Sequence, residues 1–161
     1  MTAQPSKAER PATYEDANLL LRLYELRREE KLRKAREWFS KNFHVSNLEE
    51  LQKLCPPGSE ENAYVRMVQT YWDMAASFVA QGAIDAQMFN AANTEHFALY
   101  AKMRPFLSEI RAATNYPDYL MNVERVVTSL SDAEDRVAIF SRYMERQRKF
   151  AAEGKQRAYL A

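Results

Sequence analysis

The sequence predicts an all-α protein, a single-domain helical bundle of six or seven helices, on two observations. Only three glycines occur in 161 residues, and each stands where a helical pattern stops, so hairpin turns and glycine-rich phosphate loops are not expected. Apolar residues recur at helical spacing, and no segment alternates polar and apolar positions as a strand does. A chain of this length forms one domain by the usual size of domains.

The first element is predicted to be one long N-terminal helix. Thr13 is a natural N-cap, and Glu15 and Asp16 lie in the first turn. Apolar positions then continue to about Phe39, which gives a helix of roughly 26 residues and about 39 Å. Residues 1–12 contain two prolines and no apolar run, so we expect a disordered leader there and not a signal peptide.

Capping residues and stop signals mark the remaining helices. We predict helices over residues 46–55, 59–80, 85–103, 105–110, 118–130 and 131–153. Pro105 either kinks the helix before it or begins the short one after it. Gly154 is expected to end the last helix, so the domain spans residues 13–153 and residues 154–161 form a frayed tail.

The helix over residues 59–80 is predicted to be the centre of the core, because residues 64–79 are the longest apolar-rich stretch. Charged and polar residues interrupt that stretch, which argues against a membrane span. The polar positions form one narrow stripe, which is either the solvated face or a polar line inside the bundle. They are Asn62, Arg66, Thr70, Asp73 and Ser77.

The charges are distributed unevenly, although the net charge is +1. Residues 1–45 carry +3, residues 46–101 carry −5 and residues 102–161 carry +3. This segregation fits charge matching within the fold or between subunits better than the broad basic field of a nucleic-acid binder. The single cysteine, Cys55, cannot form an intramolecular disulfide, so we expect a reducing cytoplasm and a small hydrophobic role for this residue.

No residues are nominated for catalysis, cofactor binding or metal binding. The two histidines, His44 and His96, match neither the di-iron nor the zincin spacing. His96 is interpreted as a hydrogen-bonded histidine at the edge of the core, and Glu95 as a salt-bridge partner of Lys102 or of a basic neighbouring helix. The sequence therefore favours a protein that is not an enzyme and leaves enzymatic activity open.

Arg28 is the one charged member of an apolar stripe on the first helix. Its guanidinium cannot lose its charge, so it either extends to water along its stem or forms a partly buried ion pair. In the second case it belongs to a buried polar cluster. The members of that cluster are Arg28, Glu25, Asp73, Glu95 and His96.

The first predicted helix resembles the opening of an uncharacterised family of small all-helical bacterial proteins. The resemblance covers about the first 40 residues and rests on the runs Tyr14-Glu15-Asp16, Leu23 to Glu30 and Ala35 to Phe39. It implies a bacterial source and a domain of unknown function. No activity, cofactor or site residue comes with it.

The sequence is compatible with three functions. The first is a non-catalytic interaction protein, self-associating as a homodimer, because the apolar ends of the first helix, residues 19–26 and 32–39, offer more apolar surface than a short bundle covers. The second is binding of an anion or nucleic acid through a basic patch, which interleaved glutamates weaken. That patch comprises Arg27, Lys31, Lys34, Arg146, Arg148 and Lys149. The third is a small-molecule enzyme or sensor with an aromatic-lined pocket.

Overall fold

A computed structural model describes residues 10–159, with the backbone alone at 151, 152 and 154–159. Their regular secondary structure is all helical, with no strand, which confirms the all-α class. They form more helices than the six or seven predicted. The elements are α1 (Tyr14–Arg27), α2 (Glu30–Asn42), α3 (Leu48–Leu54), α4 (Glu60–Ala80), α5 (Ala86–Ala92), α6 (Glu95–Met103), the 3-10 turn η1 (Arg104–Phe106), α7 (Leu107–Thr114), α8 (Met121–Thr128) and α9 (Ala133–Tyr159).

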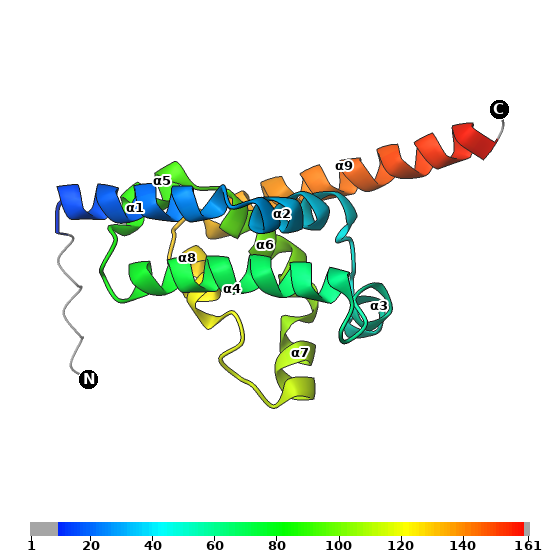
Figure 1. Cartoon of the computed structure of the whole chain (residues 1–161), viewed down its shortest axis with the longest axis horizontal. Helices are drawn as coiled ribbons and strands as arrows, with labels where there is room; N and C mark the ends of the chain where they lie inside the picture. Colours follow the sequence, from blue (N-terminus) through cyan, green and yellow to red (C-terminus); the bar gives the residue numbers. More distant parts are fainter. Residues whose placement is uncertain (1–9, 160–161) are drawn as a thin grey trace.

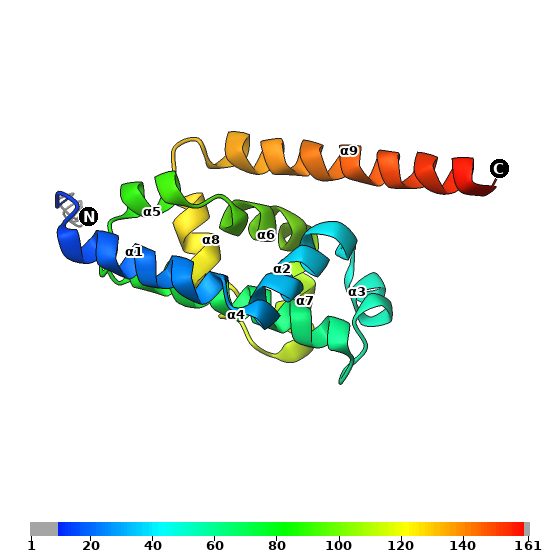
Figure 2. The ribbon, with the colours of Figure 1, turned by 45° about the horizontal axis from the view of Figure 1, so that its top comes forward.

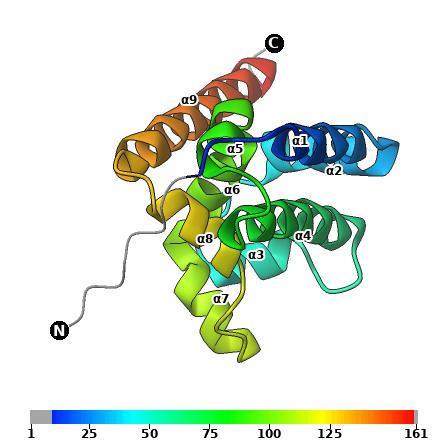
Figure 3. The same ribbon diagram turned by 90° about the vertical axis from the view of Figure 1, so that its left-hand side faces the viewer.

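Helix α4 is the centre of the core, as predicted. Ser59 caps its N-terminus through the backbone N–H of Asn62, and the helix buries residues along most of its length. It packs against α2 on one side and α8 on the other. Figure 3 shows α1, α5 and α9 along one side of the molecule and α4, α7 and α8 along the other.

The predicted long N-terminal helix is two helices, α1 and α2, because the helix is interrupted at Arg28 and Glu29. The Glu29 carboxylate accepts a hydrogen bond of 2.9 Å from the backbone N–H of Leu32 and so caps α2. An N-cap contributes about 1 kcal/mol, whereas a side-chain pair between Glu29 and Arg33 on a continuous helix contributes about 0.2–0.5 kcal/mol. As a side-chain interaction, the cap on α2 therefore stabilises the structure more than the Glu29–Arg33 pair of a continuous helix would.

The break also lets the two helices pack on different neighbours. Helix α1 lies beside α5, whereas α2 packs on α4 (Figure 1). Leu32, Ala35 and Phe39 of α2 are buried in that contact.

The predicted helix over residues 85–103 is likewise divided, into α5 and α6. Asn93 adopts an extended backbone at the end of α5, and its side-chain amide donates to the carbonyl of Phe89 at 3.1 Å. Asparagine competes with the helical backbone in this way and ends helices. After α6, Pro105 lies in the 3-10 turn η1, which leads directly into α7.

The segment predicted as a disordered leader is anchored where the structure describes it. Arg10 forms two hydrogen bonds with the buried carboxylate of Asp16, at 2.7 and 2.6 Å, and a third with the carbonyl of Gly82. Asp16 also accepts from the backbone N–H of Asp85, which ties α1 to the start of α5. The rest of the predicted leader, residues 1–9, lies outside the described residues.

Helix α9 is longer than predicted. It continues through Gly154 to Tyr159, past the predicted end of the last helix, and residues 160–161 of the predicted tail lie outside the described part. One glycine costs a helix only about 1 kcal/mol relative to alanine. The first half of α9 packs on α6 and α8, whereas its C-terminal half extends past the other helices (Figure 2).

Candidate functional site

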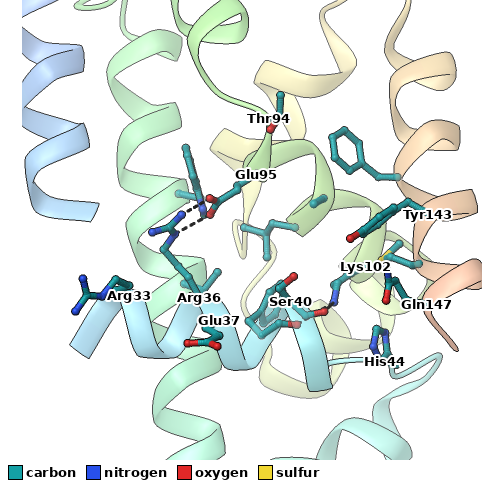
Figure 4. Close-up of a pocket in the computed structure, with 17 residues that line it drawn as sticks. Arg33, Arg36, Glu37, Ser40, His44, Thr94, Glu95, Lys102, Tyr143 and Gln147 are labelled. Atoms are coloured by element: carbon teal, nitrogen blue, oxygen red, sulfur yellow. Dashed lines mark hydrogen bonds and ion pairs between the residues drawn. The ribbon is translucent and has the colours of Figure 1, made fainter. Parts of the chain in front are cut away.

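A pocket of about 420 Å³ lies between α2, α6 and α9, with α4 at its base. Its walls are largely apolar and include Phe39, Trp72, Leu99, Phe140 and Met144. Figure 4 shows polar groups at two ends: Arg36 and Glu95 at one, and Lys102, His44 and Gln147 at the other. Segments far apart in the sequence thus combine to form the site.

At one end of the pocket, Glu95 joins three helices. As the first residue of α6, it pairs with Arg36 of α2, whose Nε lies 2.8 Å from a carboxylate oxygen, and with Arg27 of α1 at 3.8 Å. The hydrogen bonds to Glu95 raise the pKa of Arg36 above its usual value. The structure therefore pairs Glu95 with neighbouring helices and not with Lys102.

At the other end, Lys102 is a buried cation, with 8% of its surface exposed. Its ammonium donates to the carbonyls of Phe39 at 2.9 Å, Ser40 at 3.2 Å and Phe43 at 2.8 Å, all at the C-terminal end of α2. Burial lowers the pKa of Lys102 to about 8, and the nearby Arg148 contributes. The sequence signal that could have indicated this role is a lysine inside the apolar run at the end of α6.

His44 lies beside Lys102 and also lines the pocket. Its Nε2 is 3.0 Å from the carbonyl of Lys41, so Nε2 carries the proton and Nδ1 is an acceptor. That Nδ1 is buried and has no hydrogen-bond partner among the described residues. Burial lowers the pKa of His44, which keeps the ring neutral at pH 7.

His96 lies deeper than the predicted edge of the core. It has no exposed surface and packs against Trp72, Phe89 and Phe97. Its Nε2 lies 2.8 Å from Oδ1 of Asn90. Burial lowers the pKa of His96 to about 3, so this ring is a neutral core residue.

The predicted polar cluster does not assemble. Arg28 and Glu25 are exposed, and among the described side chains no carboxylate lies within salt-bridge distance of Arg28, which approaches the ring of Tyr24 instead. Asp73 faces α8, where it accepts from the backbone N–H groups of Asn122 and Val123, each at 3.1 Å. The ion-pair interpretation of Arg28 is therefore wrong. The side chain of Arg28 extends to the surface, where its guanidinium is exposed to water.

The predicted basic patch is partly neutralised within the fold. Arg27 pairs with Glu95, and Lys34 pairs with Glu60 at 3.3 Å. Lys31 is exposed on α2. The other three predicted residues are exposed on α9, and they are Arg146, Arg148 and Lys149.

The single cysteine does not carry a reactive thiol. Cys55 is buried, and burial raises the pKa of its thiol to about 11, so little nucleophilic thiolate forms at pH 7. Within residues 10–159, no three His, Cys, Asp or Glu side chains are grouped so that they could hold a metal ion. Nor does any helix in this part of the chain have the length and apolar character needed to span a membrane.

The protein is all-helical, and its long terminal helix α9 packs beside the core formed by α1 to α8 and closes one side of the pocket. The chain belongs to the family described as a domain of unknown function (DUF4760), whose model matches residues 12–130. The match extends far beyond the first 40 residues that carried the resemblance, and it ends before α9 begins. Comparison with curated proteins and with solved structures gives no match. No function is assigned by the family.

Proposed function

We propose that this protein is a non-catalytic helical interaction protein that self-associates as a homodimer through α1. The observation that carries the proposal is the outer face of α1, which leaves large apolar side chains exposed. Tyr14, Leu21 and Tyr24 follow one another at helical spacing. All three are exposed, and Leu21, in the middle of the helix, has 61% of its surface exposed. Such a surface in contact with water is typical of an interaction site.

The same face also holds a groove. It lies between α1 and α5, has a volume of about 420 Å³, and is lined by Leu20, Leu21, Tyr24, Met88 and Ala92. Apolar side chains that protrude beside an apolar groove make a surface that can complement itself. A two-fold dimer requires this property, because both protomers contribute the same patch.

The exposed charges on α1 favour an antiparallel pairing. Glu15 lies in its first turn, and Arg28 follows its last residue. In an antiparallel pair centred on Leu21, the acidic end of one helix lies beside the basic end of the other. The single buried cysteine supports a reducing cytoplasm as the setting.

The test is the mass in solution. Light scattering on a sizing column is expected to give twice 18.8 kDa, and Leu21→Glu should convert the dimer to a monomer because it places two like charges at the centre of the contact. Ile139→Glu is the matched control, since Ile139 is 54% exposed on α9. A wild-type monomer at all concentrations, or a dimer that only Ile139→Glu disrupts, contradicts the proposal.

A further inference from the structure

A buried positive charge without an acidic partner faces the pocket between α2, α6 and α9. Among the described side chains, no carboxylate lies within salt-bridge distance of Lys102; its partners are three backbone carbonyls. Carbonyl dipoles stabilise an ammonium but do not neutralise it. The other end differs, because Arg36 has a carboxylate partner there in Glu95.

We propose that this pocket binds an amphipathic carboxylate, with the carboxylate at Lys102 and an apolar body extending toward Trp72. The volume of about 420 Å³ lies within the range of about 300–1,000 Å³ usual for small-molecule sites. Between its two polar ends the pocket offers Leu99, Phe140 and Met144 to an apolar body. One charge at one end and apolar walls beyond it match a molecule with a single anionic head.

The hydrogen bonds of Lys102 allow this contact. An ammonium has three donors, and the bond to the carbonyl of Ser40 is the longest of its three, at 3.2 Å. A carboxylate replaces that bond with a charge-assisted one, which is shorter and stronger. The positive charge of Arg148, which lines a smaller cavity next to Lys102 and His44, adds to the attraction for an anion.

Two polar groups at the pocket set further requirements on the ligand. The indole N–H of Trp72 is buried and has no acceptor among the described residues, and the Nδ1 of His44 has no donor. A buried polar group without a partner is destabilising, so a ligand that supplies an acceptor near Trp72 or a hydroxyl near His44 gains affinity. Functionalised carboxylates are therefore expected to bind more tightly than simple ones.

The experiment compares octanoate with 1-octanol, which has the same chain length and no charge, by calorimetric titration at pH 7. Octanoate is expected to bind with one molecule per chain and at least about tenfold more tightly than 1-octanol, since only octanoate forms a charge-assisted hydrogen bond with Lys102. Lys102→Met should remove that preference. Equal affinities for the two ligands in the wild type overturn the assignment of the carboxylate to Lys102.

A second variant keeps the test independent of Lys102 and of its role in folding. Ala98 lines the pocket, so Ala98→Phe should fill it and abolish octanoate binding. Ala113→Phe is the matched control, because Ala113 is exposed on α7 away from the pocket. Octanoate binding that survives Ala98→Phe, or cosedimentation with phosphatidylglycerol vesicles in place of octanoate binding, overturns the proposal. The mass in solution is measured separately, so failure here leaves the proposed dimer unaffected.

Discussion

Two buried charges, Asp16 and Lys102, lie at opposite ends of the α1–α2 segment and are held in different ways. Asp16 lies in the first turn of α1, where it accepts from the Arg10 guanidinium, from Thr13 and from the backbone N–H of Asp85. Lys102 belongs to α6, and its ammonium reaches the C-terminal end of α2, where it donates to carbonyls alone. Both positions suit the helix dipole, which favours an anion at the N-terminus and a cation at the C-terminus.

The difference is whether the charge is neutralised. The hydrogen bonds from Arg10 hold the pKa of Asp16 well below its usual value, so the pair is a closed structural unit. Burial instead lowers the pKa of Lys102, which leaves a cation facing a pocket. A buried charge with its own counter-ion holds elements together, whereas one without a counter-ion also provides a place for a ligand to bind.

Removing the neutralised charge should have the largest effect. Asp16→Ala leaves Arg10 and the start of α5 without their acceptor, so we expect the melting temperature to fall by about 10 °C or more. The measurement is thermal unfolding followed by circular dichroism. Glu15→Ala is the control, since Glu15 is exposed in the same turn. Equal effects of the two substitutions would show that Asp16 acts only through the helix dipole.

The second prediction removes the charge that lacks a counter-ion. Lys102→Met keeps the length and apolar stem of the side chain but leaves the carbonyl of Phe43 without its ammonium donor. The carbonyl of Phe39 keeps only the backbone N–H of Phe43, so the substitution should cost about 2–4 kcal/mol of unfolding free energy. Urea denaturation measures this value. Lys41→Met, at an exposed lysine paired with Glu37, should cost less than about 1 kcal/mol. If Lys102→Met leaves the unfolding free energy unchanged, water replaces the ammonium as the donor to those carbonyls.

A third prediction concerns a buried group that stays uncharged. His96 has a folded pKa of about 3 against 6.5 for a free histidine, so in the window between these values the unfolded chain binds one more proton. Stability is therefore lost as the pH falls through 6.5, by about 2 kcal/mol between pH 7 and pH 5. His96→Phe should lack this loss in urea denaturation at the two pH values. An identical loss in both proteins would assign it to other groups.

The sequence predicted those elements whose signals are local. Helix α4 was expected because Ser59 caps it and apolar residues repeat along it. The break between α1 and α2 was missed because Glu29 has two local options, a pair with Arg33 or a cap for Leu32, and tertiary packing decides between them. Sequence spacing alone does not reveal such a choice.

The pocket could not be predicted for a related reason. Its key contact joins Lys102 to carbonyls 59 to 63 positions earlier in the chain, and no spacing rule connects residues so far apart. The charge segregation did indicate that some charges would be matched across the fold, as Glu95 and Arg36 are. It did not indicate that Lys102 would be left without an acid.

The smallest effect is expected at Arg28, a charge that is not buried. Arg28 follows α1 as its C-cap, and its guanidinium lies exposed, 5.9 Å from the centre of the Tyr24 ring. An exposed contact between a cation and an aromatic ring contributes about 0.5–1 kcal/mol at most. Arg28→Ala should therefore change the unfolding free energy by less than about 1 kcal/mol in urea denaturation, far below the loss expected for Lys102→Met. A loss of about 3–5 kcal/mol, as when a buried ion pair is broken, would require an acidic partner for Arg28. In the proposed antiparallel dimer, that partner would be the acidic start of the second α1, and the loss would then disappear in the Leu21→Glu monomer.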